Sequence, residues 1–215
     1  REQAEFVSEL FMGMRLRCAN CHDHPLDRWT QDDYHGLAAI FAKVKSGRVI
    51  AIDPRAEVSH PRTGEAAVPR IPGERFLDAK QDGRQQFAEW LTSKDNPYFA
   101  KAIVNRLWQS VMGRGLIEPT DDLRPTNLAT HPELLEDLAA DFAKSGFDLQ
   151  HSLRVICNSE AYARSGVTLT ANKTDVMFFS HRPTRNFLPE VFVNSICDVP
   201  GIPDTYGSEL ADTRS

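Results

Sequence analysis

Apolar residues recur every three or four positions along most of the chain, which is the spacing of one buried helix face. The first such stripe predicts a helix from about residue 2 to residue 17, with inward positions at Phe6, Leu10, Phe11, Met14 and Leu16. The same spacing predicts later helices over residues 31–43, 85–92, 97–112, 132–144, 149–156 and 189–199. Beyond residue 200 the period is lost, so we expect a loose tail at residues 201–215.

Several of these helices begin at residues that cap helix ends well. Thr30 followed by Asp33 forms an acidic variant of the capping box, and Thr130 followed by Glu133 forms the usual one. Asn96 marks another start, because its side chain accepts hydrogen bonds from the first backbone N–H groups of a helix. Local chemistry therefore supports the helix starts that the apolar period predicts.

Between residues 44 and 75 the apolar residues alternate with polar ones, which is the period of a strand. Pro61 and Gly64 suit the second and fourth positions of a β-turn. Pro69 and Pro72 cannot donate backbone hydrogen bonds, so strands here belong at a sheet edge. The sequence therefore predicts a mainly α fold, a helical domain with a small β-hairpin insertion around residues 44–75.

The 215 residues carry a formal net charge of -5. This charge gives no general basic surface, so we expect no nucleic-acid partner. No apolar run approaches the roughly 20 residues that span a bilayer, so we expect no direct membrane insertion. The chain starts with Arg1 inside a predicted helix, so we expect a piece of a longer protein whose signal peptide is not in this fragment. The sequence leaves the oligomeric state open.

The strongest chemical signal is Cys18-Ala19-Asn20-Cys21-His22, the CxxCH attachment signature of c-type haem. Two thiols three positions apart can each form a thioether with one porphyrin vinyl group. The imidazole that follows can ligate the iron as an axial ligand. We therefore predict haem c as the cofactor, bound by Cys18, Cys21 and His22, and expect Asp23 or a backbone carbonyl to accept the second ring N–H of His22.

Two other interpretations of the motif stay open. Cys18 and Cys21 with His22 or His24 supply three donors of a zinc site, which one distant histidine would complete. The two cysteines alone would form a disulfide or a redox pair. A haem needs a wide apolar pocket, whereas zinc needs only a tight knot. The aromatic side chains that suit such a pocket would equally serve a core, and they are Phe11, Trp29, Tyr34, Phe41 and Trp108.

Two histidines outside the motif are candidates for a second axial ligand or a metal ligand. His60 lies at the tip of the predicted hairpin, where ligation and a structural role are equally supported. His131 begins a predicted helix, where a partly solvated ring is favoured over ligation. An open sixth position would favour small-molecule activation over electron transfer. The histidines interpreted as ordinary surface or interface residues are His35, His151 and His181.

One polar loop brings together Asp121, Asp122 and Arg124. As a functional site it would bind a cation or a sugar hydroxyl. The favoured interpretation is structural, since carboxylates pair with guanidinium groups, here Arg106 or Arg114, to order loops. The sequence contains no recognisable nucleophile–base spacing and no phosphate-binding glycine loop. We therefore assign no catalytic residue and leave enzymatic activity open.

The other two cysteines, Cys157 and Cys197, stand in apolar helical settings. A small buried apolar side chain is the favoured interpretation at each position. A disulfide between them is the alternative in an oxidising compartment.

Eight phrases of the chain resemble, in order, one bacterial family, and they are Arg17–Pro25, Trp29–Tyr34, His60–Gly64, Asn96–Ala100, Val104–Trp108, Gly113–Leu116, Asp121–Asp122 and His131–Leu135. The chain resembles the large secreted, cytochrome-associated proteins of planctomycete bacteria, which carry two adjoining domains of unknown function, fifteen forty-nine and fifteen fifty-three. The resemblance implies the C-terminal part of the first domain at residues 1–43, a β-hairpin connection at 44–75 and a second helical domain at 76–200.

Members of this family are often exported and often carry a separate cytochrome c domain upstream, and no reaction is firmly assigned to the two domains. The resemblance therefore implies an extracytoplasmic location, periplasmic or secreted, and a redox partner protein or an upstream cytochrome domain as partner. With the motif, it favours a c-type haem-binding redox or electron-transfer domain of an exported bacterial protein. The alternative is a zinc- or disulfide-stabilised structural module of a secreted polysaccharide-processing protein.

Overall fold

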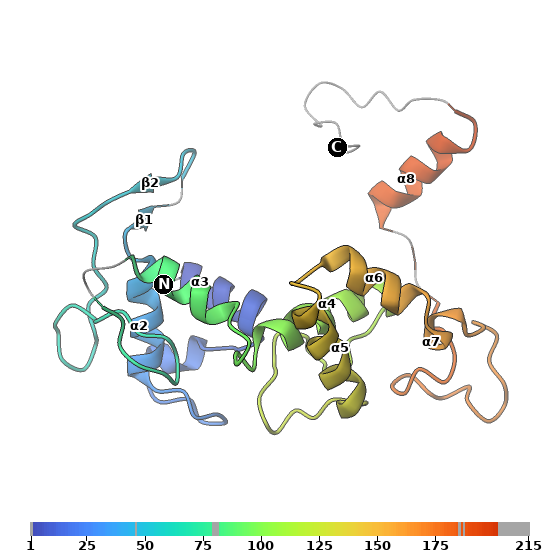
Figure 1. Ribbon diagram of the computed structural model, residues 1–215, viewed down its shortest axis with the longest axis horizontal. Coiled ribbons are helices and arrows are strands. Elements are labelled where there is room, and N and C mark those ends of the chain that lie inside the picture. The colour runs from blue at the N-terminus through green and yellow to red at the C-terminus, as the bar shows by residue number, and fades with distance from the viewer. Residues whose placement is uncertain (1, 46, 79–81, 185, 187, 202–215) are drawn as a thin grey trace. The chain divides into compact units, whose positions relative to one another are not determined.

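The computed structural model describes residues 2–45, 47–78, 82–184, 186 and 188–201, and it confirms the predicted mainly α fold (Figure 1). Its α-helices are α1 (Glu2–Val7), α2 (Gln31–Phe41), α3 (Gly83–Leu91), α4 (Phe99–Met112), α5 (Pro132–Lys144), α6 (Leu149–Cys157), α7 (Glu160–Ala163) and α8 (Pro189–Asp198). A π-helical turn at Ser8–Met12 and a 3₁₀ turn at Arg17–Asn20 lie between α1 and α2. No helix within these ranges is long and apolar enough to cross a membrane.

The chain divides into two compact units after Arg182. The first unit contains α1 to α7 and the β-hairpin, and the second contains α8. The domain boundaries that we expect near residues 43, 75 and 200 remain predictions. Of the expected loose tail at residues 201–215, positions 202–215 lie outside the described residues.

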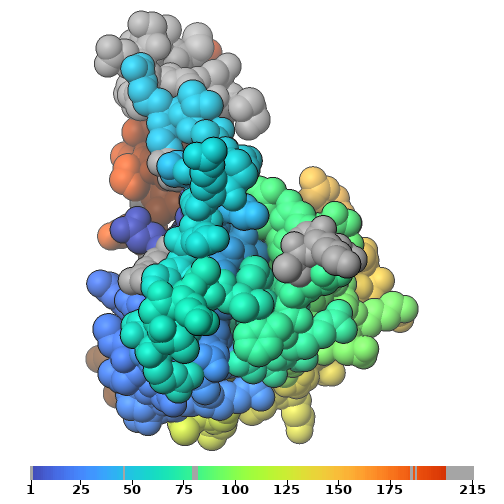
Figure 2. All heavy atoms as spheres, turned by 90° about the vertical axis from the view of Figure 1, so that its left-hand side faces the viewer, coloured from blue at the N-terminus to red at the C-terminus, as the bar shows by residue number. Residues whose placement is uncertain are grey.

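The predicted small β-hairpin within residues 44–75 is confirmed, but it lies before the predicted turn at Pro61–Gly64, so His60 is not at its tip: it is an antiparallel pair of β1 (Val44–Lys45) and β2 (Ala51–Ile52). Beyond β2, an isolated bridge joins Ser59 to Ala66 around the predicted turn. Figures 1 and 2 show the hairpin extending away from the helices, whereas the segment that follows it lies against the N-terminal helices. This segment adds three side chains to the core, namely Val58, Ile71 and Leu77.

Capping chemistry sets the start of α2, as predicted. The Thr30 hydroxyl accepts a hydrogen bond from the Asp33 N–H, and the Asp33 carboxylate accepts one from the Thr30 N–H. At α5 the predicted capping box is wrong, because the helix begins at Pro132 without a side-chain cap. The Thr130 hydroxyl instead donates to the Leu116 carbonyl at 3.2 Å. A tertiary hydrogen bond replaces the local one at this position.

The predicted continuous helix over residues 2–17 is wrong at Gly13, where the helical turns end. Gly13 adopts the left-handed conformation with φ of 62°. Its carbonyl accepts a hydrogen bond from the Leu123 N–H at 2.8 Å. A Cβ atom on Gly13 would lie 2.3 Å from Leu123 Cδ1, so only glycine fits this close approach. The helix thus ends because of a contact with Leu123, a residue far from Gly13 in the sequence.

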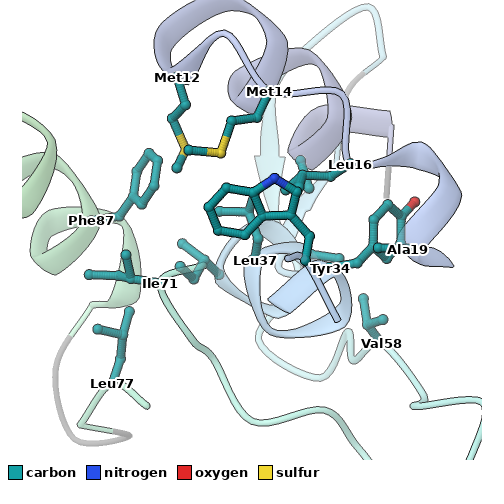
Figure 3. Close-up of a cluster of buried hydrophobic side chains, with 14 of the residues drawn as sticks. Met12, Met14, Leu16, Ala19, Tyr34, Leu37, Val58, Ile71, Leu77 and Phe87 are labelled. Carbon is teal, nitrogen blue, oxygen red and sulfur yellow. The ribbon is translucent and has the colours of Figure 1, made fainter. Parts of the chain in front are cut away.

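Two hydrophobic clusters form the core of the first unit. The first cluster gathers side chains from the N-terminal segment, α2, the segment after the hairpin and α3, and Figure 3 shows them converging, among them Met12, Met14, Leu16, Ala19, Tyr34, Leu37, Val58, Ile71, Leu77 and Phe87. The second cluster lies on α4, α5 and α6 and includes Val104, Trp108, Met112, Leu135, Phe142 and Ile156. Phe99 packs against both clusters, because its ring centroid lies 6.1 Å from that of Phe11 and 6.3 Å from that of Phe142.

Polar contacts join the N-terminal segment to the loop between α4 and α5, and we call this region the seam (Gly13, Arg15, Asp121 and Leu123). Beside the Leu123–Gly13 hydrogen bond, the Arg15 guanidinium lies 2.7 Å from an Asp121 carboxylate oxygen. Burial raises the pKa of the Asp121 carboxyl, but the hydrogen bond and charge of Arg15 oppose it and hold that pKa below its ordinary value. The seam fixes the segment that leads into the CxxCH motif.

Replacing Gly13 by alanine should destabilise the protein more than replacing Gly64 by alanine. Both glycines have positive φ, so each replacement carries a backbone strain of roughly 1–2 kcal/mol. Only at Gly13 would the added methyl group collide with Leu123, which adds about 1–3 kcal/mol of overpacking. Urea unfolding of both variants measures the difference. Equal losses for G13A and G64A would show that the seam does not require this close approach.

Replacing Asp121 by asparagine should cost roughly 0.2–1 kcal/mol at neutral pH and should make stability less sensitive to acid. Because the folded-state pKa of Asp121 is lowered, its contribution is complete above its ordinary pKa of about 4 and is lost as the pH falls through the lower folded value. The parent protein should therefore lose more stability on acidification below about pH 5 than D121N does. Asp137→Asn, at an exposed position of α5 outside the seam, is the control for the removal of one carboxylate. A D121N slope as steep as the parent's would contradict the assignment.

Candidate functional site

The CxxCH motif lies on a turn that is buried on one side and open on the other. Leu16 and Ala19 are buried in the first cluster. In a 3₁₀ turn, residues three positions apart lie above one another, so Leu16 and Ala19 face the core together. Cys18 and Cys21 have the same spacing and are both exposed. Burial of the two apolar residues therefore presents the two cysteines on the outer side of the turn.

His22 follows the turn and is exposed. Its Nδ1 lies 2.8 Å from the backbone carbonyl oxygen of Asp23. A carbonyl can only accept, so Nδ1 carries a proton, and in the neutral ring the lone pair then lies on Nε2. The Asp23 carboxylate is occupied elsewhere, since it accepts a hydrogen bond from the Gln31 N–H at 3.0 Å. His22 thus has the tautomer of a ligand that binds through Nε2.

His24 belongs to a short loop held by its own backbone. The His24 N–H donates to the Trp29 carbonyl at 2.8 Å, and His24 Nδ1 accepts from the Leu26 N–H at 3.2 Å. The buried Trp29 indole donates to the Asp27 carboxylate at 2.8 Å. Because Nδ1 of His24 is an acceptor within the loop, only its Nε2 faces other partners.

His60 is buried and both of its ring nitrogens have neighbours. Its Nδ1 accepts from the Arg62 N–H at 3.2 Å, and its Nε2 lies 3.0 Å from an Asp32 carboxylate oxygen. The same oxygen accepts a hydrogen bond from the Arg62 guanidinium at 2.9 Å. The His60 ring also packs against His35, with ring centroids 5.1 Å apart. His60 could ligate a metal only after giving up one of these contacts.

His131 is half-buried, precedes α5 and is associated with the second hydrophobic cluster. Its ring lies 6.1 Å from the rings of both Phe178 and Phe179, and its Nδ1 lies 3.3 Å from the Thr130 hydroxyl. Within the described ranges, no three His, Cys, Asp or Glu side chains come together in a group that could hold a metal ion.

The polar loop after α4 is held together by its own charges. Asp122 is buried and lies 3.3 Å from the Arg124 guanidinium. Asp121 pairs with Arg15 across the seam, and not with Arg106 or Arg114, the two partners considered from the sequence. Arg106 instead donates to a backbone carbonyl, that of Glu9, at 2.7 Å. In this structure the two carboxylates of the loop therefore form ion pairs, Asp121 with Arg15 and Asp122 with Arg124.

The residues of the motif fit the attachment of haem c, and the aromatic side chains that would suit either a haem pocket or a core lie in or against the hydrophobic clusters. Trp29, Tyr34 and Trp108 are buried in the two clusters, and Phe11 and Phe41 pack against the first one. Three cavities have other linings: one of about 470 Å³ beside α1 and α3, one of about 470 Å³ between α2 and the segment after β2, and one of about 280 Å³ under the loop after α4. Cys18, Cys21 and His22 line none of the three.

Sequence analysis missed the residues that support the motif from behind. His35, interpreted as a surface or interface histidine, is fully buried, so a surface position is wrong. Its Nε2 lies 3.0 Å from the carbonyl oxygen of Asn20, the residue that precedes Cys21 in the motif. The sequence signal that was available is the spacing of four between Gln31 and His35, which puts both side chains on one face of α2. Cys157, expected to be buried, is exposed at the end of α6, whereas Cys197 is half-buried.

The comparisons with known proteins agree with the resemblance. No curated protein and no solved structure is significantly similar to the chain. The family model PSCyt2, described as a protein of unknown function (DUF1549), matches residues 1–46. The family model PSD1, described as a protein of unknown function (DUF1553), matches residues 83–211, which is more than half of the chain. The chain therefore belongs to the PSD1 family and begins with PSCyt2 sequence, the planctomycete-type, cytochrome-associated pair of domains that it resembles.

Proposed function

We propose that the chain is a c-type haem-binding redox domain, in which Cys18 and Cys21 would attach the haem covalently and His22 would ligate its iron. One observation carries the proposal. Both cysteines are exposed on the same side of a core-anchored turn, next to an imidazole whose Nδ1 is bonded to the Asp23 carbonyl. The PSCyt2 match over residues 1–46 adds a cytochrome-associated family name to the same segment.

The chain's own groups have distinct tasks in this proposal. Cys18 and Cys21 would hold the haem through thioethers: each thiol would add across one vinyl group, forming a C–S bond and passing the thiol hydrogen to carbon, with no external oxidant consumed. The Asp23 carbonyl keeps His22 in the tautomer that offers Nε2. When bound, the haem supplies one-electron redox chemistry. Since His60 Nδ1 accepts a hydrogen bond from the Arg62 N–H and Nε2 lies 3.0 Å from an Asp32 carboxylate oxygen, His60 would become a second iron ligand only if its ring moved away from these groups.

Location and partner follow from the same proposal. Haem attachment needs reduced thiols outside the cytoplasm. The proposed location of the protein is therefore extracytoplasmic, either periplasmic or secreted. Its partner would be a redox protein or an upstream cytochrome domain of the same parent chain. Zinc binding or a disulfide at Cys18 and Cys21, in a structural module, is the competing function that the following experiment separates.

Haem attachment should be visible in an absorption spectrum of the chain after export with the c-type maturation machinery. The parent protein should keep a haem band after denaturation and reduction, because a thioether survives unfolding. C18A/C21A should lose the band, while Cys157→Ala, at an exposed cysteine outside the motif, should keep it. A colourless parent with about one equivalent of zinc would replace the haem proposal with a structural metal site. A colourless parent without metal would leave a dithiol or disulfide.

A further inference from the structure

The first two turns of α2 supply hydrogen-bond donors to the backbone of the CxxCH motif. The Gln31 side-chain amide donates to the Cys21 carbonyl at 2.7 Å. One helical turn later, His35 Nε2 lies 3.0 Å from the Asn20 carbonyl. Residues four positions apart share one face of a helix, so the two side chains reach two consecutive carbonyls of the motif.

The first hydrogen bond of the turn, from the Ala19 N–H to the Leu16 carbonyl, is 2.8 Å long, but the two at its C-terminal end are longer. The Cys21 N–H and the His22 N–H both point to the Cys18 carbonyl, at 3.3 Å and 3.5 Å. These distances are at or beyond the usual range for N–H to oxygen hydrogen bonds. The contacts from α2 are shorter, so they do more to fix the part of the motif that contains the second cysteine.

His35 is a buried and oriented donor. Its side chain is fully buried, and a carbonyl can only accept, so Nε2 carries a proton. The His60 ring packs against His35 at 5.1 Å, and His60 itself contacts Asp32, the neighbour of Gln31 on α2. The His35 ring therefore lies between the motif and a second imidazole that is held in place, and it has little freedom to turn away from Asn20.

We propose that His35 and Gln31 are positioning residues for haem attachment. They hold the Asn20 and Cys21 carbonyls so that both thiols stay on the outer side of the turn, with His22 beside them. This inference rests on the proposed haem-binding function and adds the residues that prepare the site before the haem arrives. Neither side chain touches the haem in this role, because both act through the backbone of the motif.

The test compares variants that remove or preserve each donor. His35→Phe keeps a ring without a donor, whereas His35→Gln places an amide N–H the same number of bonds from Cα. Gln31→Leu removes the second donor without entering the core. Its matched control is Gln85→Leu on α3. The Gln85 side chain is exposed and donates to Glu89 of the same helix, away from the motif. Two readouts are needed: hydrogen exchange at residues 17–22 in the haem-free chain, and covalent haem per folded chain after export.

Loss of either donor should speed exchange at residues 17–22 by about five- to tenfold, as expected for one lost hydrogen bond. Exchange in α4 should not change, and covalent haem should fall severalfold. H35Q should restore both quantities, and Q85L should match the parent.

If H35F does not fold, Q31L alone decides. Parent-like haem content in Q31L, or in a folded H35F, would overturn the inference while leaving haem binding intact. A colourless parent would overturn haem binding itself, and the inference with it.

Discussion

The structure depends first on the burial of one short stretch, Met12 to Ala19. Met12, Met14, Leu16 and Ala19 enter the first hydrophobic cluster, and burying such side chains stabilises the fold by about 1–3 kcal/mol each for the larger ones. Because this burial fixes which way the backbone faces, it also fixes where the polar residues between these positions point. The exposure of both motif cysteines and the position of the seam follow from it.

Local chemistry made much of the fold predictable, and long-range contacts account for the errors. The capping box at Thr30 is local, and it forms as predicted. The end of the first helical stretch depends on Leu123, which lies more than a hundred positions from Gly13. The Thr130 hydroxyl is likewise taken by a distant carbonyl. No periodicity within the N-terminal segment contains that information.

The candidate site was predictable in its identity but not in its surroundings. The spacing of Cys18, Cys21 and His22 is a chemical signature, so it can be read from sequence alone. Aromatic residues have no such signature, since the same ring can line a pocket or fill a core. Trp29 and Tyr34 fill the core here. The buried position of His35 was hidden for a related reason: only its packing against His60 and the motif backbone distinguishes it from a surface histidine.

The seam has a consequence for how this protein changes over generations. Two family models match its two ends separately, yet residues from both regions share one folded unit through the contacts of Gly13 and Arg15 with Leu123 and Asp121. A recombination event that joined either region to an unrelated sequence would leave an arginine and a backbone carbonyl without their partners. The two regions therefore have to stay in one chain, at this separation, for the contacts of the seam to form.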